Sequence, residues 1–129
     1  MPIKRILSTT IRVSDADKAI DFYVNKLGFE KRRDEPFGME GAQMDLRWIE
    51  VAPPGAETVI ILAQGYGKEA SELGTFSGIV LGSDDIYVTC TEMKQKGVHF
   101  VEEPQEQAWG LVQAIFHDQD ENVLVIVGR

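Results

Sequence analysis

The 129-residue chain has a single cysteine, Cys90, and so cannot form an internal disulfide. It has no run of the roughly 18 apolar residues that a membrane-spanning helix needs, and its first residues, MPIKRILSTTIRV, lack the apolar core of a signal peptide. Basic residues are few: 13 Lys and Arg stand against 21 Asp and Glu, a formal charge of −8 that repels nucleic acid and anionic lipid. These absences predict a cytoplasmic bacterial protein that binds neither nucleic acid nor membrane, with Cys90 buried and inert.

Common catalytic signatures are also missing. The sequence has no Ser-His-Asp arrangement with supporting context, no phosphate-binding glycine loop and no CxxC pair. The remaining composition, with 43% hydrophobic and 26% charged residues, is that of an ordinary globular protein. The length fits one domain, or two small halves that share a core.

The first half of the chain predicts one strand, one helix and three further strands. Residues 6–13 are rich in β-branched side chains and alternate in polarity, which favours a strand. Asp15 can cap a helix that runs to about Lys26, and Gly28 can end it in a left-handed conformation. Strands are then predicted in FEKRRDE, RWIEVA and TVIILA.

The second half repeats this order. FSGIVLGS predicts a strand, Asp84 or Asp85 caps a helix to about Lys96, and Gly97 ends it; VHFVEE, GLVQAIFH and NVLVIVG predict three strands. Asp84 to Gly97 spans 13 positions, the same as Asp15 to Gly28. We therefore predict an α+β fold of two βαβββ modules, residues 1–63 and 76–129, joined by a glycine-rich linker at 64–75 within one domain.

Three segments, VSDADKAIDFYVNKLGFE, RWIEVAPPGAETVIIL and EEPQEQAWGLVQAIFHDQDENVLVIV, resemble the vicinal oxygen chelate superfamily. This group includes glyoxalase I, bleomycin-resistance and fosfomycin-resistance proteins, and extradiol dioxygenases. The resemblance covers nearly the whole chain in the right order. It implies cupped, half-barrel mixed sheets with helices on the outer face, and a cavity built from two modules, often within a homodimer.

The resemblance also implies where a metal ion would bind: a His at the start of the first strand of a module and a Glu on its last strand. The matching positions hold Ser8 and Ile61 in the first module, and Gly78 and Val125 in the second. A catalytic zinc site needs about three His, Cys, Asp or Glu ligands, and magnesium or manganese needs oxygen donors. We therefore predict no metal cofactor, with a divalent metal held by other residues as the alternative.

Other donor residues are present outside these positions. His117, Asp118 and Asp120 cluster in the last hairpin, where we expect a turn held by Asx-type hydrogen bonds rather than a metal site. His99 is expected to face outward at the start of its strand. Glu121 replaces the glycine that is common in the family's turn, and is strained if its φ is positive.

Alternation along the first strand places Leu7, Ile11 and Val13 under the helix. Ser8, Thr10 and Arg12 then point into the cavity. The other reading is that this polar face meets water or a dimer partner. Either Trp48 or Arg47 faces inward, depending on register. The predicted ligand-binding residues are Ser8, Thr10, Arg12, Arg47, Trp48, Ile61, Val80, Trp109 and Val125.

Several roles stay open among these residues. Arg12 or Arg47 could bind a ligand carboxylate or phosphate, or could instead pair with Glu50 or Asp45. The aromatic residues could pack in the core rather than contact a ligand. A loop with Phe37, Met39 and Met44 could cover the opening of the cavity.

The sequence thus predicts a small-molecule-binding protein of the bleomycin-resistance type, a homodimer that binds an apolar or aromatic ligand without metal. A charge of −8 would favour bulky cationic ligands. The alternative is a glyoxalase- or dioxygenase-like enzyme, a lyase or isomerase, that uses a divalent metal or Glu50 as a proton shuttle. A third possibility is a domain whose dimer surface is its function.

Overall fold

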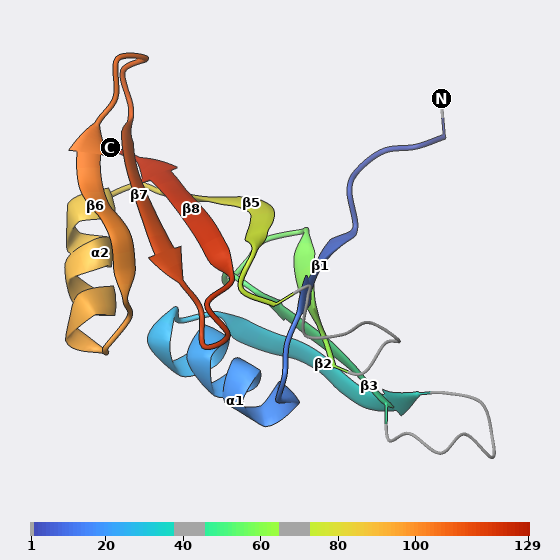
Figure 1. Cartoon of the computed structure of the whole chain (residues 1–129). Helices are drawn as coiled ribbons and strands as arrows, with labels where there is room; N and C mark the ends of the chain where they lie inside the picture. Colours follow the sequence, from blue (N-terminus) through green and yellow to red (C-terminus); the bar gives the residue numbers. More distant parts are fainter. Residues whose placement is uncertain (1, 38–45, 65–72) are drawn as a thin grey trace. The chain divides into compact units, whose positions relative to one another are not determined.

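The computed structural model describes residues 2–37, 46–64 and 73–129 (Figure 1). The chain divides into two compact units, Met1–Glu72 and Leu73–Arg129. Each unit contains one four-stranded sheet and one helical segment in the order βαβββ. The predicted α+β class with two βαβββ modules is confirmed. Most of the predicted linker, residues 65–72, lies outside the described residues.

The first unit consists of β1 (Ser8–Arg12), α1 (Ala16–Ile20), η1 (Asp21–Lys26), β2 (Glu30–Phe37), β3 (Leu46–Ala52) and β4 (Val59–Ala63). Its strands are ordered β1-β4-β3-β2. β1 is parallel to β4, whereas β3 is antiparallel to both β4 and β2.

The second unit consists of β5 (Phe76–Ser83), α2 (Ile86–Gln95), β6 (Phe100–Glu106), β7 (Val112–His117) and β8 (Val123–Gly128). Its strand order, β5-β8-β7-β6, repeats that of the first unit, and β5 is again the parallel partner of the last strand. The internal repeat in the sequence is therefore a repeat of sheet topology.

One face of each sheet packs against its own helix. In the first unit the buried residues of this face come from β1 and the residue after it, β3 and β4: Ile11, Val13, Ile49, Val51, Ile60 and Leu62. In the second unit, Ile86, Cys90 and Met93 of α2 are buried above Ala114, Phe116, Leu124 and Ile126. Leu7 was expected in the first core, but it precedes the first paired residue of β1 and is 63% exposed.

The first helix begins and ends at the predicted residues but changes its winding on the way. The Asp15 carboxylate accepts hydrogen bonds from the backbone N–H groups of Asp17 and Lys18, and Gly28 follows with a φ of 77°. From Asp21 to Lys26 the helix is a π-helix. Its wider turn coincides with two adjacent buried aromatic residues, Phe22 and Tyr23, whose rings make an edge-on contact.

Neither helix of the described ranges has the length and hydropathy of a transmembrane span.

Candidate functional site

The face of the first sheet that lies away from α1 carries a row of side chains from all four strands. Thr10 of β1 pairs with Ile61 of β4, Ile61 pairs with Glu50 of β3, and Glu50 pairs with Arg33 of β2. Paired residues on adjacent strands point to the same side of a sheet. We call this side, with Ser8, Thr10, Arg12, Trp48, Glu50 and Ile61, the helix-free face of the first unit.

Trp48 and Glu50 form a polar contact on this face. They stand two positions apart on β3, and the Trp48 indole Nε1 donates a hydrogen bond of 2.7 Å to Glu50 Oε2. Both side chains are half-buried, and Ile61, beside Glu50, is 5% exposed. The register therefore places Trp48 rather than Arg47 on the helix-free face, bonded to a carboxylate that pairs with an aliphatic side chain.

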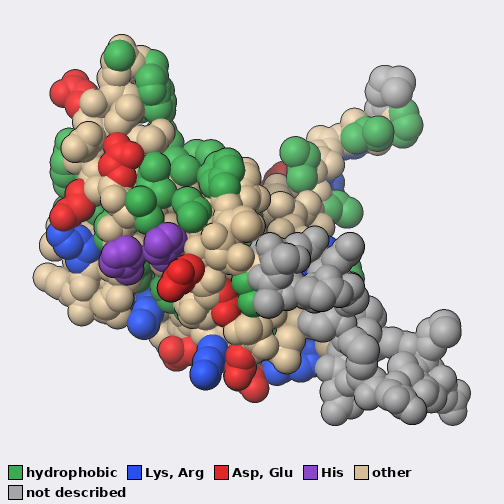
Figure 2. Space-filling view, viewed as in Figure 1, with side chains coloured by type: hydrophobic (Ala, Val, Ile, Leu, Met, Phe, Trp, Pro, Cys, Tyr) green, Lys and Arg blue, Asp and Glu red, His purple; other side chains and the backbone are tan. Residues whose placement is uncertain are grey.

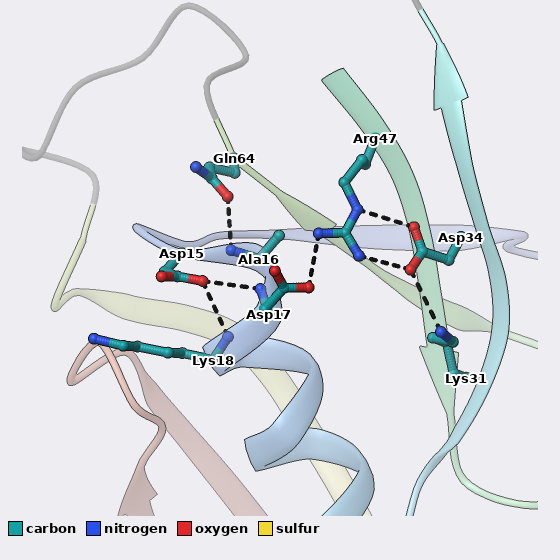
Figure 3. A network of polar contacts seen from close by, with 8 residues as sticks. All are labelled: Asp15, Ala16, Asp17, Lys18, Lys31, Asp34, Arg47 and Gln64. Atoms are coloured by element: carbon teal, nitrogen blue, oxygen red, sulfur yellow. Dashed lines mark hydrogen bonds and ion pairs between the residues drawn. The ribbon is translucent and has the colours of Figure 1, made fainter. Parts of the chain in front are cut away.

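Arg47 lies on the opposite face and joins the sheet to the helix (Figure 3). Its Nη2 and Nε donate to the two carboxylate oxygens of Asp34 at 2.7 and 3.1 Å, and its Nη1 donates to Asp17 of α1 at 2.8 Å. The hydrogen bonds from Arg47 lower the pKa of Asp34, against the effect of burial, and Lys31 adds to the lowering. The same contacts, Asp34 first, raise the pKa of Arg47. Arg47 was predicted to bind ligand, but two carboxylates already occupy its guanidinium on the helix side.

The start of α1 is held from the sheet as well. Gln64, just after β4, accepts a hydrogen bond of 2.6 Å from the backbone N–H of Ala16 through its side-chain Oε1 (Figure 3). Together with the Asp15 cap, this satisfies N–H groups of the first turn that have no partner within a helix. The polar residues around Arg47 thus stabilise the packing of the helix on the sheet, on the side opposite the helix-free face.

The polar residues of β1 lie where the alternation predicted. Ser8 pairs with Val59 and Arg12 with Ala63, so both share the side of Thr10. Ser8 and Thr10 are exposed and Arg12 is half-buried. Their contact with a ligand stays a prediction.

The helix-free face of the second unit, which we define by Val80, Gln113, Ile115, Val123, Val125 and Val127, is mainly aliphatic. Val80 of β5 pairs with Val125 of β8, Val125 with Ile115 of β7, and Ile115 with Glu102 of β6. Val80 is 59% exposed. Trp109 is 57% exposed and lies in the turn between β6 and β7, beyond the last paired residues of the two strands.

The two sheets show the same arrangement at the positions where the superfamily places metal ligands. In each unit, the residue that pairs with the mapped Glu position lies two residues after the mapped His position. Thr10 follows Ser8 and pairs with Ile61, and Val80 follows Gly78 and pairs with Val125. No imidazole or carboxylate stands at either pair or at Ser8 and Gly78. The donor set at these positions therefore does not fit a divalent ion. Within residues 2–37, 46–64 and 73–129, no three His, Cys, Asp or Glu side chains are grouped to hold one.

The Asx-type turn predicted in the last hairpin is confirmed. Asp118 Oδ1 accepts from the backbone N–H groups of Asp120 and Asn122 at 2.8 and 3.0 Å, and Oδ2 accepts from the Asn122 side chain at 3.0 Å. Asp118 and Asn122 are both buried. Glu121 has a φ of 63°, so the strain that was conditional on a positive φ is present.

Sequence reasoning missed one contact. The imidazoles of His99 and His117 lie side by side, although 18 positions separate them, because β6 and β7 pair in a hairpin. A His at the start of one predicted strand and another at the end of the next was the available signal.

The predicted loop residues Met39, Met44 and Asp45, and the side chain of Phe37, fall outside what the structure describes. Cys90 is confirmed as buried, at 2% exposed. Burial raises the pKa of its thiol to about 11.

Comparison with known proteins gives the family. The sequence model of the Glyoxalase/Bleomycin resistance protein/Dioxygenase superfamily matches residues 5–126. A solved structure of a member of this superfamily from Sphaerobacter thermophilus is 35% identical, with a TM-score of 0.85 over 100% of both chains. TnmS3, an antibiotic binding protein from a Streptomyces species, is 33% identical, with a TM-score of 0.82 over 99% of this chain and 98% of that one.

A curated relative, a probable lactoylglutathione lyase from a Synechocystis species, is 34% identical and aligns over 89% of this chain and 88% of its own length. The family model covers most of the chain, and the fold and the paired βαβββ units agree with it. The chain therefore belongs to the Glyoxalase/Bleomycin resistance protein/Dioxygenase superfamily.

Proposed function

We propose that the protein binds an apolar or aromatic small molecule on its helix-free faces, without a metal ion at the superfamily's position. The observation that carries this proposal is that Ile61 and Val125 occupy mapped metal-ligand positions, with Thr10 and Val80 paired beside them. A hydroxyl and three aliphatic side chains give surface for an apolar ligand but no set of donors for an ion.

Trp48 and Glu50 suggest the chemistry of the ligand. The hydrogen bond from Nε1 to Glu50 holds the indole ring in one orientation, so that its π-face can stack on an aromatic group. A carboxylate beside the ring, in a protein of charge −8, attracts a cation. The relative TnmS3, an antibiotic binding protein of similar structure, supports this class of function. In this proposal the protein acts as a homodimer.

The alternative is a lyase or isomerase, which the 34% identity to a probable lactoylglutathione lyase favours. Without a metal at the mapped positions, Glu50 would have to move the proton. It lies on the helix-free face, beside Ile61, with one oxygen bound to Trp48. Substitution of Glu50 by Gln would abolish proton transfer and hence turnover. The binding function predicts only weaker binding of cations, because the amide keeps a hydrogen-bond acceptor for the indole but loses the charge.

The test measures binding of proflavine, a planar aromatic cation, against anthracene carboxylate, a planar anion. Proflavine should bind with the higher affinity, and Trp48→Ala should weaken its binding by about tenfold or more, as truncation of a central aromatic contact does. Tyr87→Ala is the matched control, since Tyr87 is a 53% exposed aromatic residue on α2 of the other unit. Equal affinity of the Trp48 and Tyr87 variants would contradict the proposed site.

Metal analysis of the purified protein and a lyase assay test the alternative. We expect no lactoylglutathione lyase activity with or without added Zn²⁺, Ni²⁺ or Mn²⁺. Metal-dependent turnover at the helix-free faces would overturn the proposal in favour of an enzyme.

A further inference from the structure

His99 and His117 are the only two histidines of the chain, and the second unit brings them together. Their Nδ1 atoms are 3.1 Å apart, and the rings stack with centroids 5.1 Å apart and planes inclined by 25°. Figure 2 shows the two imidazoles (purple) side by side at the molecular surface. Two imidazole nitrogens this close would repel each other if both presented lone pairs, so a proton or an ion between them is needed to explain the contact.

The backbone holds both histidines in place. The N–H of His117 donates to the carbonyl of His99 at 2.9 Å, next to the paired residues Phe100 and Phe116. Phe116 is fully buried, and its ring lies 6.0 Å from that of Phe100. The Cα positions are thus set by a hydrogen bond and a packed aromatic pair, so that a ligand binding to the imidazoles need not order the backbone.

The spacing of the nitrogens is that of two ligands on one metal ion. With metal–nitrogen bonds of about 2.05 Å, two imidazole nitrogens are about 2.9 Å apart at a right angle and about 3.3 Å apart at the tetrahedral angle. The observed 3.1 Å lies between these values. In the absence of an ion, the same spacing allows one Nδ1–H to donate to the other Nδ1, and an ion takes the place of that shared proton.

Among the described residues, no carboxylate joins the two imidazoles to make a group of three metal ligands. Both oxygens of Asp118, the next residue after His117, accept hydrogen bonds within its own turn. The site therefore consists of two nitrogen donors. Imidazole favours Cu²⁺, Ni²⁺ and Zn²⁺, whereas Mg²⁺ and Ca²⁺ prefer oxygen ligands.

We propose that His99 and His117 form a two-imidazole binding site for a transition-metal ion of the Cu²⁺, Ni²⁺ or Zn²⁺ class, with water in the remaining coordination positions. These residues differ from Gly78 and Val125, the positions mapped for the superfamily's ion. His117 pairs with Val123, so the site lies at the end of the second unit's helix-free face.

The experiment titrates untagged protein with Ni²⁺ by calorimetry, with Mg²⁺ as the control ion and His99→Gln and His117→Gln as the variants. We expect one Ni²⁺ per chain, no binding of Mg²⁺, and a loss of about tenfold or more in affinity for each variant, because chelation needs both rings. Melting curves in EDTA check that the variants fold. At a free Ni²⁺ concentration about ten times the dissociation constant, the melting temperature should rise by roughly 4 °C in the native sequence only.

A second measurement needs no variant. In the native protein, substoichiometric Cu²⁺ should broaden the ring-proton resonances of both histidines together, before other signals change. Absence of Ni²⁺ and Cu²⁺ binding, broadening of only one histidine, or affinity retained in either variant would overturn the proposal.

The double variant also keeps this proposal separate from the proposed function. A divalent ion that is lost in His99→Gln/His117→Gln supports the two-imidazole site and leaves metal-free ligand binding intact. An ion that remains in the double variant contradicts the metal-free helix-free face instead.

Discussion

The arginine that joins sheet and helix makes the sharpest stability prediction. Arg47 holds Asp34 through two hydrogen bonds and Asp17 through one. The two carboxylates differ in burial: the Asp34 side chain is 18% exposed and the Asp17 side chain 80% exposed. Double-mutant cycles of Arg47→Gln with Asp34→Asn and with Asp17→Asn should therefore give unequal coupling energies.

The expected magnitudes follow from geometry and burial. A two-bond guanidinium–carboxylate contact that is partly buried is worth about 1 kcal/mol, after allowance for solvent screening because Arg47 itself is 32% exposed. The pair with exposed Asp17 should contribute about 0.3 kcal/mol. Arg47→Gln alone should cost about 1–2 kcal/mol, or roughly 3–6 °C in melting temperature.

Urea unfolding at neutral pH, in low salt and in about 1 M NaCl, measures both couplings. The Arg47 contact lowers the pKa of Asp34 below its ordinary 3.8 in the folded protein. The stabilisation is therefore present above the unfolded-state pKa and is lost as the pH falls through the folded-state pKa. Equal couplings for Asp17 and Asp34, or a coupling with Asp34 that does not weaken in acid, would refute this reasoning.

Three further predictions concern single residues. Glu121→Gly should stabilise the protein by about 0.5–1 kcal/mol in urea unfolding, because glycine adopts a φ of 63° without strain; Gly97→Ala, at a φ of 91°, should do the opposite. Asp118→Ala should cost about 2–3 kcal/mol by leaving two backbone N–H groups unpaired, with a smaller loss for Asp118→Asn, which keeps an acceptor oxygen. Cys90, with its pKa raised to about 11, should react with a thiol reagent at pH 8 about 100-fold more slowly in the folded than in the unfolded protein. Because the folded protein favours the neutral thiol, the stability that this preference contributes is lost as the pH rises through the raised pKa. Fast labelling of the folded protein would show that α2 opens.

The features that the sequence predicted correctly are local ones. Asp15 caps its helix with hydrogen bonds to residues two and three positions away, and Gly28 and Gly97 end helices through their own φ angles. Such features depend on neighbours in the chain, so residue type and spacing determine them. The π-helix from Asp21 to Lys26 was not predicted, because the burial of two adjacent aromatic residues depends on the sheet beneath them.

The assignment of Arg47 and Trp48 to faces needed the sheet. Strand alternation separates the two residues but does not say which side meets the helix. Ile49 and Val51 share the side of Arg47 and are fully buried, whereas Trp48 shares the side of Glu50. The β-branched residues Ile49 and Val51 indicated which side meets the helix. The charge of Arg47 argued against that side, because its partner Asp17, in the first turn of α1, could not be identified from the sequence.

The contact of His99 with His117 was missed for a different reason. The pairing of β6 with β7 shifts register twice, between Phe100 and Glu102 and between Glu102 and Gln105. Counting back from the turn therefore misplaces the residues that face each other at the far end of the hairpin.

A physical separation of roles explains why the family is evident from this sequence and the reaction is not. The fold depends on side chains that face the helices, on the glycine caps and on the Asp118 turn. In the proposed function the chemistry depends on the helix-free faces, where Thr10 pairs with Ile61 and Val80 with Val125. Side chains on these faces do not point toward the helices, so their type has little effect on the packing under the helices. The two units keep the same strand order and the same pairing offset, so the backbone geometry of each sheet does not depend on which side chains stand at these positions.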